Sequence, residues 1–128
     1  TNVLLSSTLW DGSVAQKLLF KLIKHEVKIF ASEAILSEYK KVLRRDFEYS
    51  DDGIFDITEK VVSFMTLVMP VEKVDVVKND PEDNKVIECA LASSSNYLIT
   101  YDKHLLNLKS FRKIRIITPE EAFGLIDF

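Results

Sequence analysis

Three acidic side chains stand close together in the segment NDPEDNKVIECA, residues 79–90. Asp80, Glu82 and Asp83 surround Pro81, and an apolar run follows them. Such a group can start a helix, because Asp80 is a candidate N-cap, Pro81 suits the first helical position, and acids in the first turn oppose the helix dipole. It can also supply oxygen ligands to a divalent cation. Helix capping is a sufficient explanation for the segment taken alone.

The elements that would position these acids alternate between helices and strands. Periodic apolar residues predict helices, and short β-branched or aromatic runs predict strands. In the first half of the chain we expect a helix in 13–27, a strand in 27–31, a helix capped by Ser32 and a loop at 50–53. A helix from Ile54, stopped by Pro70, and a short strand in 67–71 should follow. In the second half we expect a helix after Asp80, a strand at 96–100, a short helix within 101–111, a strand at 114–118 and a last helix with Thr118 as its N-cap. This alternation predicts an α/β fold with a mostly parallel sheet and helices on both faces.

This topology indicates where an active site would lie. In open parallel sheets, ligands bind beyond the carboxyl ends of the strands. Asp102 follows the strand at 96–100, and Asp83 opens the helix that leads into that strand. Glu38 lies in the second turn of the helix after Ser32, at the edge of its apolar stripe.

The composition restricts the class of protein. The 128 residues fit one domain, residues 1–128, and no apolar run has the length of a membrane span. Cys89 is the only cysteine, which excludes a disulfide framework and favours the cytoplasm. A net charge of −3 argues against a protein that simply coats nucleic acid. The three glycines form no phosphate-binding loop.

Four segments in this order resemble the PIN-domain family, in particular the PIN proteins grouped with bacterial and archaeal toxin–antitoxin systems. The resemblance covers nearly the whole chain, and the third segment is its most specific part. The segments are TNVLLSSTLW, ASEAILSEYKKVL, DPEDNKVIECALASSSNYLITYDKHLLNL and IRIITPEEA. The resemblance implies a three-layer α/β/α fold around a central, mostly parallel sheet. It also implies a metal-dependent ribonuclease site made of three or four carboxylates.

The resemblance assigns site residues by matching motif positions. The second acid of the family's site corresponds to Glu38, the third to Asp83 and the fourth to Asp102. Asp80 fits the Asp-Pro pattern of the toxin subgroup, but we rank it below Asp83 because capping explains it.

The first motif of the family is an Asp-Thr-Asn at the end of the first strand, and only its last two residues match, as Thr1 and Asn2. In this fold the first strand lies in the middle of the sheet. Without it, both neighbouring strands would lose ladder hydrogen bonds and have exposed faces. We therefore expect the natural chain to have a short apolar strand that ends in Asp upstream of Thr1.

Carboxylates that meet in one pocket repel each other, and a divalent cation removes that conflict. Oxygen ligands suit Mg²⁺ or Mn²⁺, which can activate a water for attack on a phosphodiester. We assign Asp83 and Asp102 to the metal, Glu38 to a water of the metal, and Thr1 and Asn2 to orienting the upstream Asp or touching phosphate.

These assignments predict an endoribonuclease that acts as a toxin, with RNA as its substrate. The resemblance further implies an antitoxin protein, which often inserts a basic residue toward the acids, and homodimers are common among such domains. Lys85 either guides the RNA backbone or is an ordinary solvated lysine. A catalytically impaired PIN-like domain used for binding or regulation is the main alternative. A phosphoacceptor receiver domain is a less favoured alternative. It would need a pair of acids after the first strand, an Asp at the end of a central strand and a Lys near the end of the chain, and the sequence does not show this arrangement.

Overall fold

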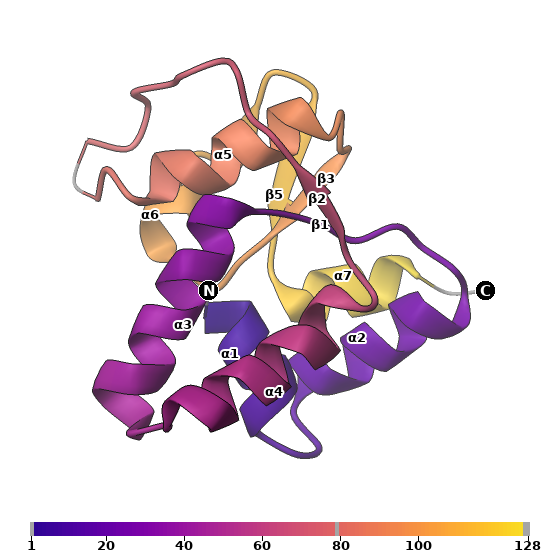
Figure 1. The fold of residues 1–128 in the computed structure, drawn as a ribbon. Helices are drawn as coiled ribbons and strands as arrows, with labels where there is room; N and C mark the ends of the chain where they lie inside the picture. Colours follow the sequence, from indigo (N-terminus) through magenta and orange to yellow (C-terminus); the bar gives the residue numbers. More distant parts are fainter. Residues whose placement is uncertain (1, 79, 127–128) are drawn as a thin grey trace.

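The computed structural model of the chain describes residues 2–78 and 80–126 (Figure 1). The helices are α1 (Asn2–Leu9), α2 (Val14–Lys24), α3 (Glu33–Phe47), α4 (Asp51–Val62), α5 (Asp83–Ala92), α6 (Lys103–Leu106) and α7 (Pro119–Leu125). The strands are β1 (Phe30–Ser32), β2 (Thr66–Val68), β3 (Tyr97–Ile99), β4 (Ser110–Phe111) and β5 (Ile114–Ile117). The predicted α/β class is confirmed. Within the two described ranges, no helix is long and apolar enough to cross a membrane.

The described strands form two small sheets, where one central sheet was expected. β1 and β2 pair in parallel, with Phe30 opposite Thr66. β5 pairs in parallel with β3 and antiparallel with β4. Among the described residues, β1 and β3 each pair along one edge only, and no strand bridges them. Two of the three described strand pairings are therefore parallel, as predicted, but the described strands do not form a single central sheet.

A cavity of about 650 Å³ lies between the two sheets. Phe30 and Ala31 of β1 line it, as do Leu98 and Ile99 of β3. Helices α2 and α5 contribute further apolar side chains to its wall, including Leu18. The unpaired edges of β1 and β3 thus border one apolar space.

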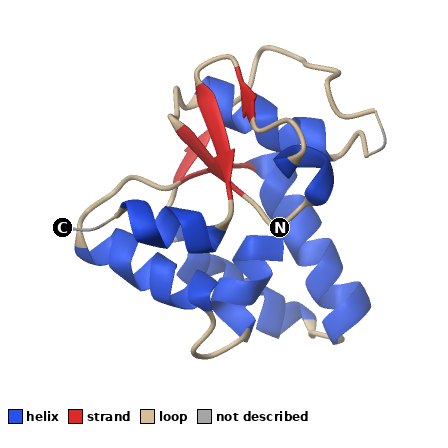
Figure 2. Cartoon of the chain, turned by 180° about the vertical axis from the view of Figure 1, so that it is seen from behind, coloured by secondary structure: helices blue, strands red, loops and turns tan. Residues whose placement is uncertain are grey.

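The strands β3 and β5 lie next to helices (Figure 2). Ile116 of β5 lies in one apolar cluster with Ile87 of α5. Ile117 lies in a different cluster with Leu18 of α2 and Ala122 of α7. Because successive side chains of a strand point to opposite faces, these two clusters lie on opposite sides of β5. Helices therefore make apolar contacts with β5 on both of its sides.

The third apolar cluster joins α1, α3 and α4 and fixes the direction of α3. Tyr39 and Leu43 of α3 are fully buried, and they pack in one cluster with Leu4 of α1 and Val61 of α4. The hydroxyl of Tyr39 lies 2.8 Å from Oγ1 of Thr8, within hydrogen-bonding distance. Because Tyr39 anchors α3 to α1, the neighbouring residues of α3 have a defined position.

Two predicted helix starts are confirmed. The Ser32 hydroxyl accepts a hydrogen bond from the amide of Ile35 at the start of α3. The Thr118 hydroxyl accepts from the amide of Glu121, whose carboxylate accepts from the amide of Thr118 in return. This second pair is a capping box, and it satisfies two amides that the first turn of α7 leaves without partners.

The boundaries of α4 differ from the prediction. Residues 50–53 were expected to form a loop, but Ser50 is an N-cap whose hydroxyl accepts from the amide of Gly53 at 3.1 Å. Asp51 and Asp52 lie in the first turn, where the helix dipole favours negative charge. The helix ends at Val62, well before Pro70, because the chain that follows leaves it to pair as β2 with β1.

Candidate metal centre

Three carboxylates meet beside the amino-terminal end of α5. Asp80, Asp83 and Asp102 each offer a carboxylate oxygen, and these oxygens all lie within 4.8 Å of one another. Asp80 precedes α5, Asp83 is its first residue, and Asp102 follows β3. The helix leads into β3 through a short turn, so its start lies beside the end of that strand. The cluster therefore occupies the place that the topology of parallel sheets predicts for a ligand.

The structure corrects the interpretation of Asp80 as a helix cap. Helix α5 begins at Asp83, and its N-cap is Glu82, which makes no capping hydrogen bond with its side chain. Residues 80–83 form a tight turn instead, in which the amide of Asp83 donates to the carbonyl of Asp80 at 3.0 Å. The backbone of Asp80 closes the turn, and its carboxylate is left to face Asp83 and Asp102.

Asp83 has the most strongly perturbed acidity in the cluster. The pKa of Asp83 is raised to about 7, mainly because the group is buried. The adjoining carboxyl of Asp102 and the negative charges of Asp80 and Glu38 raise this pKa further. One of its carboxylate oxygens, Oδ2, is buried and has no hydrogen-bond partner within the described part of the chain. Buried polar atoms are rarely left unpaired in proteins. An oxygen in this position suits a cation.

Asp102 is held in one orientation by its own backbone neighbours. Its Oδ1 accepts a hydrogen bond from the amide of His104 at 2.8 Å and so caps α6. Its amide donates to the hydroxyl of Thr100 at 3.0 Å. These two bonds fix the residue while it remains half-buried beside Asp83. Asp102 therefore serves as a helix cap and as a member of the cluster.

Glu38 lies outside the tight cluster. It is half-buried on α3, and it is not among the described acids whose oxygens come within 4.8 Å of one another. Its charge nevertheless contributes to the raised pKa of Asp83. Glu38 is thus close enough to act on the cluster electrostatically, from a second helix that faces it.

The two remaining predicted residues cannot be placed in the same way. Thr1 lies outside the described residues. Asn2 begins α1, but its side chain is not described. The basic residues that follow the acids are better defined: the ammonium of Lys85 lies 3.8 Å from a carboxylate oxygen of Glu88, and Lys103 and His104 are exposed on α6.

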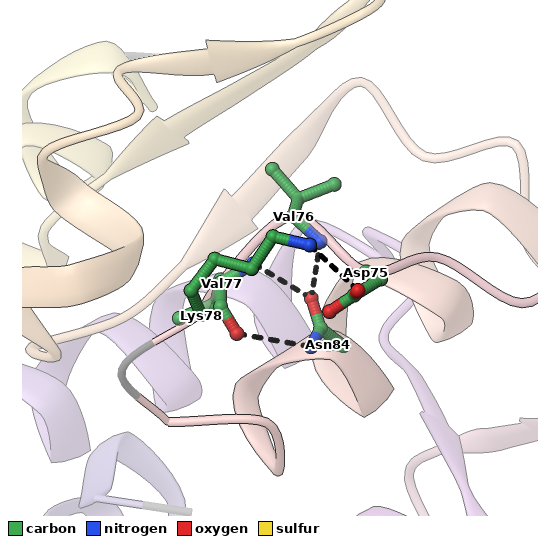
Figure 3. Close-up of polar contacts among 5 residues, drawn as sticks. All are labelled: Asp75, Val76, Val77, Lys78 and Asn84. Carbon is green, nitrogen blue, oxygen red and sulfur yellow. Dashed lines mark hydrogen bonds and ion pairs between the residues drawn. The ribbon is translucent and has the colours of Figure 1, made fainter.

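Two buried polar residues of α5 were not singled out from the sequence. Asn84 is 5% exposed and Glu88 is 4% exposed. Both hold the backbone of the extended segment before the cluster, as Figure 3 shows for Asn84. The available signal was their spacing, because residues four positions apart share one face of a helix. Asn84 and Glu88 lie on a face that also contains the apolar core residue Ile87.

The donor set fits a hard divalent cation. Three carboxylates offer oxygen ligands only, which suits Mg²⁺ or Mn²⁺ better than the softer metals. Burial and the neighbouring carboxylates raise the pKa of Asp83, and one of its oxygens has no hydrogen-bond partner among the described residues. A bound cation would compensate for both.

The chain is similar to a known protein family. A family model described as PIN domain matches residues 1–104. The matched range contains Glu38 as well as all three acids of the cluster. No curated protein matches the chain with significant similarity.

Proposed function

Because the chain belongs to the PIN-domain family, we propose that it is a metal-dependent endoribonuclease that cleaves phosphodiester bonds of RNA. PIN domains are generally nucleases and bind divalent metals. The observation that carries the proposal is the meeting of carboxylate oxygens of Asp80, Asp83 and Asp102 within 4.8 Å of one another, with a buried oxygen of Asp83 that has no hydrogen-bond partner among the described residues.

The acids would divide the work of such a site. Asp83 and Asp102 would hold Mg²⁺ or Mn²⁺, and Asp80 would complete the ligand set from the turn before α5. A cation there would polarise the scissile phosphate and lower the pKa of the attacking water. Glu38, outside the tight cluster, would orient that water and accept its proton. No covalent intermediate with a side chain is required.

RNA is a polyanion, so positively charged side chains near the acid cluster would be needed to bind it. Lys103 and His104 follow Asp102 directly and are exposed. They are the residues that we propose contact RNA phosphates near the cleavage site. Lys85 is partly engaged by Glu88 and would contribute less. The cation itself would offset part of the repulsion between the acids and the phosphates.

A cleavage assay tests the enzymatic function. Single-stranded RNA should be cut in the presence of Mg²⁺ or Mn²⁺, and cleavage should stop with chelator and in Asp83→Asn. Metal-dependent RNA binding without cleavage would instead identify a catalytically impaired PIN-like binding module. Failure of the wild-type protein to bind either metal would overturn the proposal altogether.

The biological role that we propose is that of a toxin in the cytoplasm, paired with an antitoxin protein. The support is the resemblance to toxin-type PIN proteins and a cluster of negative charge that a basic residue of an antitoxin could enter. Expression in a bacterial host should arrest growth, and Asp83→Asn should relieve the arrest. Unimpaired growth with the active enzyme would contradict the role without contradicting the ribonuclease activity. A homodimer, also proposed from the resemblance, is tested by light scattering.

A further inference from the structure

Asn84 ties the start of α5 to the chain segment that precedes the acid cluster. Its side-chain oxygen accepts hydrogen bonds from the amides of Val76 at 3.0 Å and Val77 at 2.9 Å. Its side-chain nitrogen donates to the carbonyl of Val77 at 3.2 Å. Figure 3 shows all three bonds converging on one amide group. The carboxamide of Asn84, a residue that is 5% exposed, thereby makes three hydrogen bonds.

The segment that Asn84 holds has no strand partner. Residues 74–77 belong to no described helix or strand, yet Val77 is 4% exposed and packs in the cluster with Ile87. Buried backbone groups need partners, and side chains of α5 provide them here. Glu88 acts on the same segment one turn further along the helix, accepting from the amide of Val74 at 3.1 Å.

The position of this contact matters for the metal ligands. Asn84 directly follows Asp83, and Val77 lies three residues before Asp80, so the hydrogen bonds between Asn84 and Val77 close a loop that contains both acids. Within the loop, the amide of Asp83 donates to the carbonyl of Asp80 at 3.0 Å. Asp80 is therefore preceded by a residue that Asn84 holds in place, Val77, and it is itself tied to Asp83 by the turn. Its carboxylate lies close to those of Asp83 and Asp102.

We propose that Asn84 is a positioning residue of the metal site, which presents Asp80 to the cation without contacting it. The inference rests on the proposed function, because it concerns the ligands of that site. In this proposal Asp80 is a metal ligand, and its position depends on the side chain of Asn84. Residues that orient metal ligands typically change metal affinity by about 10- to 100-fold when they are replaced.

The test is a double-mutant cycle on Mn²⁺ affinity, measured by the electron paramagnetic resonance signal of free Mn²⁺ in the absence of RNA. Asn84→Ala should weaken Mn²⁺ binding by about tenfold or more, and Asp80→Ala should weaken it at least as much. If Asn84 acts through Asp80, the double variant should bind no more weakly than Asp80→Ala alone. Losses that multiply in the double variant would overturn the inference.

The matched control is Glu88→Ala. Glu88 is as buried as Asn84 and holds the same segment, but its contact at Val74 lies further along the chain from Asp80 and Asp83. This variant should lose thermal stability and keep the Mn²⁺ affinity of the wild type. An equal loss of affinity in Glu88→Ala would mean that general loosening of the segment explains the effect, and it would contradict a positioning role for Asn84.

A milder variant covers the case in which Asn84→Ala does not fold, as judged by circular dichroism. Asn84→Ser replaces the carboxamide with a shorter polar group, a hydroxyl, and a severalfold loss of Mn²⁺ affinity is expected. Wild-type affinity in a folded Asn84 variant would overturn the inference and leave the proposed nuclease intact. A wild-type protein that binds no Mn²⁺ would overturn the proposed function, and this inference with it.

Discussion

Two helices of this protein begin with nearly the same sequence and use it differently. The start of α7 reads Thr-Pro-Glu-Glu, residues 118–121, and the start of α5 reads Asp-Pro-Glu-Asp, residues 80–83. In α7 the polar residue before proline and the acid three positions later form a capping box. In α5 neither acid caps the helix, which begins at Asp83, two residues later than the start at Pro81 that the pattern predicts.

The difference shows what the acids of α5 lack. The carboxylate of Glu121 accepts from the amide of Thr118 at 3.1 Å, so its charge is satisfied by the helix itself. Oδ2 of Asp83 has no such partner in the described part of the chain, and its neighbours are two further acids. Local rules of helix formation are broken at α5 and kept at α7. Such a departure is typical of functional sites, where a ligand supplies the missing compensation.

The largest expected effect comes from removing the acid at the centre of the α5 cluster. Asp83→Asn should abolish metal-dependent RNA cleavage, with a loss that exceeds the roughly 100-fold upper range for residues that only orient a ligand. In the absence of metal and at pH 8, the same variant should unfold at a higher temperature, because it removes a crowded charge. Cleavage assays and thermal unfolding measure the two effects. Retained activity would contradict the proposed role of Asp83.

A second substitution examines the acid that lies outside the tight cluster. Glu38→Gln should lower the maximal cleavage rate by about 100-fold, the scale of a group that handles a proton in the transition state. Mn²⁺ affinity should change little, because Glu38 is not within the group of closely spaced ligand oxygens. Single-turnover kinetics at saturating Mn²⁺ separate the two quantities. A large loss of affinity would mean that Glu38 is a direct ligand.

The acidity of Asp83 predicts how metal binding depends on pH. Because its pKa is raised to about 7, protons compete with the cation below that pH. Mn²⁺ affinity should fall by up to about tenfold for each pH unit below 7 and level off above it. Titrations from pH 5.5 to pH 8.5 measure this. Affinity that is independent of pH would contradict the predicted competition.

The same shift predicts the stability of the metal-free protein. The pKa of Asp83 is raised from a usual value of 3.8 to about 7 on folding. The contribution of this group to stability is therefore fully present below about pH 4 and is lost as the pH rises through 7. Difference curves of unfolding free energy between wild type and Asp83→Asn isolate this contribution. Excess Mn²⁺ should remove the loss at high pH.

The smallest expected effect lies at the other helix. Thr118→Ala removes the hydroxyl that caps α7, and the free energy of unfolding should fall by about 1 kcal/mol. Mn²⁺ affinity and RNA cleavage should be unchanged, since the cap lies outside the acid cluster. Chemical denaturation and the Mn²⁺ titration provide both measurements. Weaker Mn²⁺ binding in this variant would contradict the claim that the start of α7 has no part in the metal site at α5.

This pair of helices also shows what the sequence could predict. Thr118 and Glu121 interact with their own helix, so the local pattern was sufficient. Asp80 has an equally good local pattern, but the neighbouring Asp102 arrives from a distant part of the chain, and capping was therefore wrongly assigned. The clustering of Asp83 with Asp102 was predicted from topology and from the family resemblance together.

Other differences have the same origin in tertiary structure. The end of α4 at Val62 depends on the pairing of β2 with β1, which periodicity alone does not reveal. Asn84 was overlooked because its partners are backbone groups of an irregular segment, which its four-residue spacing from Glu88 does not reveal. The division into two sheets depends on the space between β1 and β3, where no described strand provides a bridge.

The most direct test of the central claim is anomalous X-ray diffraction from a crystal soaked in Mn²⁺. The three carboxylates should hold the ion, giving an anomalous peak within coordination distance of Asp80, Asp83 and Asp102, and Asp83→Asn crystals should lack it. A wild-type crystal with no peak among these three side chains, soaked above pH 7, would contradict the account.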